Sequence, residues 1–188
     1  MSTRSSFIGP MITLLSATNR PGSNTRLLTT LIERLYTQAG VTCQVLDLAD
    51  LPPEIFNPAS YAEKPAAFAP FAEAILASDG VVIVTPEYNG SFPGVLKYFI
   101  DMLPFPASFE NRPVCFVGLA AGMWGALRSV EQLQHILGYR NAHLYPNRVF
   151  IPGVGQVLKD GEIQDADLLA RLQKQATGFA AFVQRLKA

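Results

Sequence analysis

The feature that most constrains the fold is a repeated change of hydrophobic period along the chain. Short apolar runs end in polar loops, and each loop leads into residues whose apolar positions recur at helical spacing. The run GVVIVT at 80–85 is so uniformly apolar and β-branched that both of its faces are expected to be covered. Strands and helices alternate about five times. Right-handed βαβ connections then predict an α/β three-layer sandwich, with a five-stranded parallel sheet and helices on both faces.

The same periodicity assigns the elements by residue range. Strands are predicted at 11–17, 41–48, 80–85 and 112–120, with a fifth supplied by 142–144 and 148–151. Helices are predicted over 27–35 (ending at Gly40), 67–77, 93–103, 126–137 (ending at Gly138) and 168–186. The Pro-rich segment 52–66 is expected to cross the surface irregularly. Ligands of such sheets bind beyond the carboxyl ends of the strands, which here lead into loops 16–25, 85–91 and 120–126.

Length and charge narrow the class of protein. The 188 residues suit one domain, predicted at 11–188 behind a flexible tail at 1–10. Fifteen basic residues balance fifteen acidic ones, which argues against broad attachment to nucleic acid or to an anionic membrane. No apolar run approaches the roughly 18 residues of a membrane helix, and no signal peptide precedes the first strand, so a cytoplasmic location is expected.

The cysteines and histidines indicate no further chemistry. Cys43 and Cys115 lie in apolar strand-like runs and are interpreted as buried reduced thiols. Neither histidine has a metal-ligand spacing with a cysteine or a carboxylate, so no metal site is expected.

The loop after the first strand has the composition of a phosphate site. A helix follows it, and a helix N-terminus offers unpaired N–H groups and the positive end of its dipole. Gly22 is the only glycine of this loop, and no Gly-Lys-Ser/Thr sequence follows it. The loop therefore suits a terminal monophosphate better than a dinucleotide or a P-loop ligand. A plain N-cap, with Ser23 or Asn24 closing the first turn, explains the loop equally well. The polar side chains concerned are those of Ser16, Thr18, Arg20, Ser23, Asn24 and Thr25.

The loop after the third strand, TPEYNGSFPG, is suited to a flat ligand. Tyr88 can stack on a ring, and Asn89 and Gly90 can present main-chain groups to ring heteroatoms. The alternative is a structural strand-to-helix turn in which Tyr88 covers the core.

Three motifs stand in these loops. Residues 17–23 match G-S-x-R-x-x-S, residues 86–101 match P-E-Y-N-x-S-x-P-G-x-L-K-N-x-I-D, and residues 120–129 match S-G-G-x-x-G-G-x-R-A. In these motifs the sequence resembles the NAD(P)H-dependent FMN reductases, a flavodoxin-like family that includes quinone, azo-dye and chromate reductases. The likeness runs from about Met11 to Gly153.

The resemblance implies roles for the residues at the matched positions. Thr18, Arg20, Ser23 and Thr25 would hold the FMN phosphate, with Asn24 beside them. The isoalloxazine ring would be lined by Pro86, Glu87, Tyr88, Asn89 and Gly90. The ribityl chain and the far edge of the ring would be flanked by Ala120, Ala121, Gly122 and Gly125.

The resemblance also implies a reaction and an assembly. NADPH or NADH would pass hydride to flavin N5, and a small oxidised acceptor such as free flavin, a quinone or an azo compound would receive two electrons. No side chain is expected to act as a catalytic acid or base, because the flavin carries the chemistry. A homodimer or homotetramer is expected, with segment 52–66 and helix 93–103 as the candidate contacts.

Alternatives remain at this stage. The chain could be a non-enzymatic flavodoxin-like electron carrier or FMN-binding sensor, or it could bind another phosphorylated ligand. It departs from the family motifs at Ala17, Thr18 (which keeps the hydroxyl of the family's serine), Tyr98, Ala120, Ala121 and Ala126. Trp124 either shapes acceptor access or packs against a neighbouring subunit. A 2′-phosphate of NADPH could be met by Arg112, Arg128, Arg140 or Arg148.

Overall fold

The structure is a computed structural model that describes residues 9–187. Its main sheet contains β1 (Met11–Ser16), β2 (Thr42–Asp47), β3 (Gly80–Pro86) and β4 (Pro113–Leu119), and all of its pairings are parallel. The strand order β2-β1-β3-β4-β5 is that of the flavodoxin-like fold and confirms the predicted fold class. Of the predicted N-terminal tail, residues 1–8 lie outside the described residues.

The fifth strand position is shared by two short segments. β5 (His143–Leu144) pairs with Pro113 and Val114 at the start of β4, and β6 (Val149–Ile151) pairs with the end of β4. Both segments named from the sequence are therefore used. They occupy one edge of the sheet and are separated by residues 145–148.

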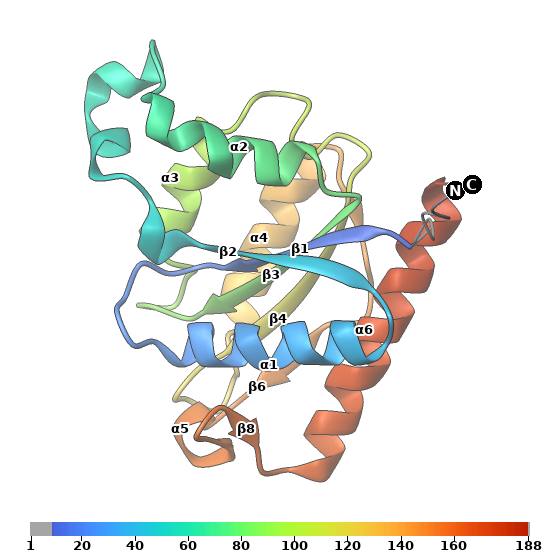
Figure 1. The fold of residues 1–188 in the computed structure, drawn as a ribbon. Coiled ribbons are helices and arrows are strands. Elements are labelled where there is room, and N and C mark those ends of the chain that lie inside the picture. The colour runs from blue at the N-terminus through green and yellow to red at the C-terminus, as the bar shows by residue number, and fades with distance from the viewer. Residues whose placement is uncertain (1–8, 188) are drawn as a thin grey trace, which may run out of the picture.

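The helices cover both faces of the sheet (Figure 1). α1 (Asn24–Gln38) and α6 (Ala166–Lys187) pack on one face, where their apolar side chains form a core with alternate residues of β1, β3 and β4. α2 (Ala69–Leu76), α3 (Gly94–Met102) and α4 (Leu127–Tyr139) cover the other face and bury the remaining residues of the same strands. β3 and β4 are buried along their whole length because they lie between the two helical layers.

Helix α1 ends as predicted, whereas α4 does not. Gly40 takes a positive φ of 72° after α1, and the N–H of Val41 donates to the carbonyl of Tyr36, as in a Schellman cap. Gly138 was expected to play the same part for α4, but the helix runs through it to Tyr139. Asn141, at φ 58°, supplies the left-handed residue instead, since asparagine tolerates this conformation.

The Pro-rich segment is more ordered than predicted. Residues 48–68 contain four short 3-10 helices: Leu48–Asp50, Pro53–Phe56, Pro58–Tyr61 and Ala66–Phe68. The last of these takes up the first residues of the helix predicted at 67–77, so that α2 itself begins at Ala69. Tyr98 of α3 is the residue that stands where the family motif has asparagine. Its hydroxyl donates a hydrogen bond to the carbonyl of Ile55 at 2.7 Å, which links the Pro-rich segment to α3.

Residues 154–163 form elements that the periodicity did not predict. α5 (Val154–Val157) is followed by a hairpin of β7 (Leu158–Lys159) and β8 (Glu162–Ile163). Asp160 and Gly161 at its tip both have positive φ, as a two-residue type I′ turn requires. Across residues 9–187, no helix combines the length and the apolar character needed to cross a membrane.

Candidate functional site

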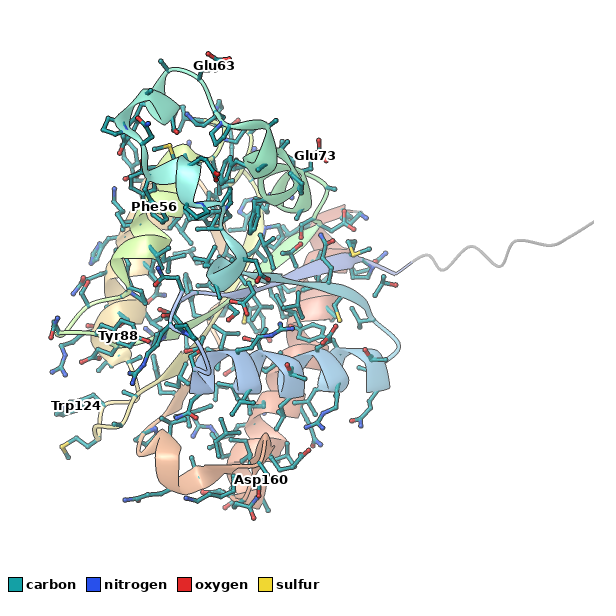
Figure 2. The ribbon with its side chains drawn as sticks, turned by 60° about the vertical axis from the view of Figure 1, so that its left-hand side comes forward. Phe56, Glu63, Glu73, Tyr88, Trp124 and Asp160 are labelled. Atoms are coloured by element: carbon teal, nitrogen blue, oxygen red, sulfur yellow. The ribbon has the colours of Figure 1, made fainter. Side chains whose placement is uncertain are left out.

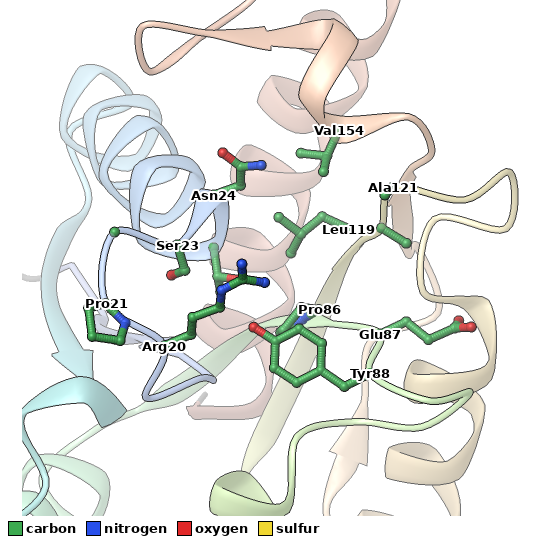
Figure 3. A pocket seen from close by; sticks show the side chains of 13 residues that line it. Arg20, Pro21, Ser23, Asn24, Pro86, Glu87, Tyr88, Leu119, Ala121 and Val154 are labelled. Carbon is green, nitrogen blue, oxygen red and sulfur yellow. The ribbon is translucent and has the colours of Figure 1, made fainter.

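A pocket of about 380 Å³ lies at the carboxyl ends of the central strands, within the size range of small-molecule sites. Its walls come from the loops after β1, β3 and β4, where the order of the strands reverses between β1 and β3. Figure 3 shows how these loops surround it. The residues that line it are Arg20, Pro21, Gly22, Ser23, Asn24, Thr25, Pro86, Glu87, Tyr88, Leu119, Ala120, Ala121 and Val154.

The first loop leads directly into the N-terminus of α1. Ser23 is the N-cap, and its Oγ accepts a hydrogen bond from the N–H of Arg26 at 3.2 Å. The N–H groups of Asn24 and Thr25 belong to the first turn, which has no intrahelical partners for them. Gly22 makes the turn into the helix at φ 64°. Ser23 is therefore the N-cap, as one of the two interpretations of the sequence had it. The N–H groups of Asn24 and Thr25 remain available to an anion.

The second loop is a tight two-residue turn. Tyr88 and Ser91 exchange main-chain hydrogen bonds of 2.8 and 3.1 Å, which encloses Asn89 and Gly90 at φ 52° and 75°. Positive φ at both central residues defines a type I′ turn, for which Asn-Gly is a preferred sequence. Within residues 9–187, the N–H groups of Asn89 and Gly90 take no part in a hydrogen bond, so both donors are free for a ligand.

Tyr88 joins the first two loops. Its hydroxyl is hydrogen-bonded to that of Thr18 at 3.1 Å, and Thr18 in turn accepts from the N–H of Arg20 at 3.3 Å. Thr18 is buried beneath the loop. The tyrosine ring therefore lines the pocket from a fixed position, with its hydroxyl toward the first loop (Figure 3).

Helix α4 holds the second loop from the outside. Arg128 forms an ion pair with Glu87 and donates from Nε to Oε1 at 2.8 Å. The Oγ of Ser129 donates to the carbonyl of Pro86 at 3.2 Å, and Nε2 of Gln132 donates to the carbonyl of Gly90 at the same distance. Sequence reasoning named Arg128 only as a candidate for a 2′-phosphate, and it did not predict that Arg128, Ser129 and Gln132 contact the second loop. Gln132 lies four positions after Arg128 and three after Ser129, so it neighbours both on the helix surface, which was the local signal available.

Glu87 is directed away from the first loop (Figure 3). Its side chain is 8% exposed, and Oε2 is buried with no hydrogen-bond partner among the described residues. The carboxylate is therefore committed to Arg128 through one oxygen only. Glu87 lines the pocket, but the guanidinium of Arg128 largely offsets its negative charge.

The third loop is held against β6 by a close main-chain approach. The N–H of Ala120 donates to the carbonyl of Ile151 at 3.0 Å. Gly125 has φ 55°, and a Cβ added there would lie 2.8 Å from the nitrogen of Ile151. Ala126 follows at φ 72°, a left-handed conformation that explains why the family motif has glycine at this position.

The predicted site residues divide into two groups. Those on the pocket wall are Arg20, Ser23, Asn24, Thr25, Pro86, Glu87, Tyr88, Ala120 and Ala121. Those off the wall are Ser16, Thr18, Asn89, Gly90, Gly122 and Gly125. Ser16 is fully buried, and its Oγ has no hydrogen-bond partner within residues 9–187.

Four lining residues were not predicted: Pro21, Gly22, Leu119 and Val154. Leu119 ends β4, and Val154 follows the end of β6, so both lie where parallel strands present their ligand sites. The position of the fifth strand could have indicated Val154. Trp124, at the tip of the third loop, is 54% exposed and lies on the same side of the molecule as Tyr88 (Figure 2).

The donor set of the pocket fits a phosphorylated aromatic ligand. The guanidinium of Arg20 forms no ion pair within residues 9–187, whereas Arg26 is paired with Asp47 and Arg128 with Glu87. An unpaired guanidinium beside a helix N-terminus suits a phosphate. The ring of Tyr88 lines the same pocket and offers a face on which an aromatic ligand can stack.

The arginines considered for a 2′-phosphate lie in different places. Arg112 donates to the carbonyls of Ser108 and Leu76, and Arg140 is buried against the carbonyls of Ile100 and Pro104. Arg148 donates to Gln134. Within the part of the chain that the structure describes, only Arg128 of the four bonds to a pocket-lining residue.

Both cysteines are free thiols. Cys115 is fully buried, and burial raises its pKa well above the ordinary value, so the thiol stays protonated. Cys43 is only half-buried, which corrects the expectation that both are buried. Burial raises its pKa as well.

The sheet is doubly wound, and its β1/β3 switch point carries a loop suited to phosphate together with an aromatic residue. These features are typical of flavodoxin-like mononucleotide-binding proteins. The family model of the NADPH-dependent FMN reductases matches residues 10–156. The chain belongs to the NADPH-dependent FMN reductase family.

Relatives with curated names agree with this assignment. The chain is 40% identical over 128 residues to a quinone reductase of Escherichia coli K12, covering 65% of this chain and 68% of that protein. It is 30% identical to an NAD(P)H-dependent FMN reductase of Pseudomonas aeruginosa, covering 79% and 82%. The flavoenzyme NAD(P)H:acceptor oxidoreductase FerB of Paracoccus denitrificans superposes with a TM-score of 0.80 at 22% identity, covering 94% and 98%, which shows the fold.

Proposed function

We propose that residues 11–188 act as one FMN-binding domain that uses NADPH or NADH to reduce small oxidised acceptors, among them quinones, azo compounds and free flavin. The observation that carries the proposal is the meeting of two features in one pocket: an unpaired guanidinium beside a helix N-terminus, and the ring of Tyr88. Relatives named quinone reductase and azoreductase support this choice of acceptors.

In this proposal the residues of the first loop hold the phosphate. Arg20 supplies charge and the first turn of α1 supplies N–H donors, while Ser23, Asn24 and Thr25 line the same wall. Thr18 contributes indirectly, because its hydroxyl fixes Tyr88 and the N–H of Arg20.

The residues of the second and third loops would orient the ring. Tyr88 offers a face, and the free N–H groups of Asn89 and Gly90 offer donors to N5 and O4. Ala120 and Ala121 line the same pocket, where their small side chains would leave room for the ribityl chain. When bound, FMN would accept a hydride at N5 from the nicotinamide and return two electrons to an acceptor.

The test is an anaerobic titration of the purified protein. We expect a yellow protein whose flavin bands bleach on adding NADPH or NADH, and comparison of the two nicotinamides gives the preference. A panel of quinones, azo compounds and free flavin then gives the acceptor. Colour without bleaching would point to an electron carrier or sensor, and a protein that ignores added FMN would point to another phosphorylated ligand.

Assembly and location belong to the same proposal. We place the contact of a homodimer or homotetramer on the segment 52–66 and α3, where the exposed rings of Phe56 and Tyr61 gather around Tyr98. Light scattering measures the mass directly. The proposed location is the cytoplasm. Neither nucleic acid nor a membrane is proposed as a partner, because the fifteen basic residues balance the fifteen acidic ones.

Tyr88→Ala is expected to change the visible spectrum of bound FMN, because the ring that stacks on the flavin is removed. Stacking contributes about 0.5–1.5 kcal/mol, so binding should weaken while the phosphate contacts remain. The matched control is Tyr88→Phe, which keeps the ring and loses only the bond to Thr18. Identical spectra for the wild type and the alanine variant would rule out stacking on Tyr88.

A further inference from the structure

Among residues 9–187, the hydrogen bonds between α4 and the tip of the turn that carries the free donors all involve the side chain of Gln132. Gln132 donates from Nε2 to the carbonyl of Gly90 at 3.2 Å, and its Oε1 accepts from the hydroxyl of Ser91 at 2.6 Å. The other α4 contacts hold the loop further back, at Pro86 and Glu87. The tip of the turn therefore depends on Gln132.

The geometry of this anchor has a consequence for the donors. The carbonyl of Gly90 and the N–H of Ser91 belong to one peptide group, and that N–H is bonded to the carbonyl of Tyr88. Gln132 and Tyr88 thus fix both ends of this peptide. With it fixed, the orientation of the preceding N–H groups, those of Asn89 and Gly90, is set by the positive φ of both residues.

We propose that Gln132 is a positioning residue for the flavin ring, acting through Gly90 rather than by touching the ligand. The inference rests on the proposed function, since it requires FMN in this pocket. Its physical reason is that N5 of oxidised flavin accepts a hydrogen bond, whereas N5 of reduced flavin carries a proton and cannot. Donors held at fixed positions therefore bind the two redox states unequally, and releasing them changes the ratio of the two affinities.

Gln132 is well suited to a test because its side chain is exposed and its removal leaves the core intact. We expect Gln132→Ala to weaken FMN binding about threefold to tenfold, the effect of losing one or two hydrogen bonds. The loss should differ between oxidised and reduced FMN, which appears as a shift of the midpoint potential of the bound flavin.

Two further variants sharpen the experiment. Gln134→Ala removes the same side chain from the same helix, where it bonds to Arg148 and not to the loop, and should keep the wild-type affinities and potential. Ser91→Ala removes only the bond between Ser91 and Gln132 and should stay close to the wild type, because the bond to Gly90 remains.

The outcomes separate this inference from the proposed function. Affinities of Gln132→Ala that match the wild type, or that fall equally for both redox states, would overturn the positioning role. A Ser91→Ala variant that reproduces the whole shift would do the same, since the Gly90 bond would then be unimportant. A wild-type protein that binds no FMN would instead refute the proposed function itself.

Discussion

Replacing Arg20 by alanine is expected to weaken FMN binding by about 1–3 kcal/mol, the scale of a charge-assisted hydrogen bond to phosphate. This corresponds to roughly a 5-fold to 150-fold rise in the dissociation constant. The guanidinium lies on the pocket side of the first loop and has no carboxylate partner within residues 9–187 (Figure 3). Its charge is therefore available to a phosphate. Fluorescence titration of the apoprotein with FMN measures the effect.

Arg26→Ala is the matched control for this prediction. Arg26 is the third residue of α1, the helix that follows the first loop, but it pairs with Asp47 at 3.4 Å and lies outside the pocket wall. Its removal should leave FMN affinity within about twofold, because its charge is already paired with Asp47 and its side chain does not line the pocket. Lysine at position 20 keeps the charge but loses the planar fork, and an intermediate affinity is expected. An alanine variant at position 20 that binds FMN like the wild type would show that the phosphate lies elsewhere.

The second large effect is expected from Gly125→Ala, which should destabilise the protein by about 2–4 kcal/mol. Gly125 combines a left-handed conformation with a close approach to β6. A methyl group there would lie 2.8 Å from the nitrogen and 3.0 Å from the carbonyl carbon of Ile151. Backbone cannot yield as a side chain can, so the third loop must move away from β6. Urea unfolding monitored by circular dichroism gives the free energy.

Gly122→Ala provides the control in the same loop. A Cβ added at Gly122 would have no non-neighbouring atom of residues 9–187 within 4 Å, and the φ of Gly122 is outside the left-handed range. The stability of this variant should stay within about 0.5 kcal/mol of the wild type. Equal stabilities for the two alanine variants would show that the packing of Gly125 against β6 is not what holds the third loop.

Much of the site could be predicted because its parts are local. Ser23 as an N-cap depends on the N–H of Arg26 three residues away, and the turn at Asn89–Gly90 depends on the two residues themselves. The hairpin tip at Asp160–Gly161 is equally local, since an Asp-Gly pair by itself favours a two-residue type I′ turn. The prediction that α4 ends at Gly138 was wrong, because a glycine permits a helix to end without requiring it.

Other parts of the site could not be predicted because they join distant residues. Arg128, Ser129 and Gln132 contact the second loop across 41 to 43 positions. The hydroxyl pair of Thr18 and Tyr88 spans 70 positions. No periodicity reports such pairs, since they exist only after β1, β3, β4 and α4 have packed together.

The sequence by itself determined the alternation of strands and helices, the main caps and turns, and the three loops that carry polar and aromatic groups. These features follow from backbone sterics and from hydrophobic spacing over a few residues, which any segment carries with it. The tertiary structure alone decided that the loops enclose one pocket and that α4 anchors the turn. It also decided that Arg128 is bound to Glu87 while Arg20 has no ion-pair partner within residues 9–187. The reason is that parallel strands bring their carboxyl ends to one edge of the sheet only when the helical crossovers pack against the sheet. The same packing sets the partner of each side chain.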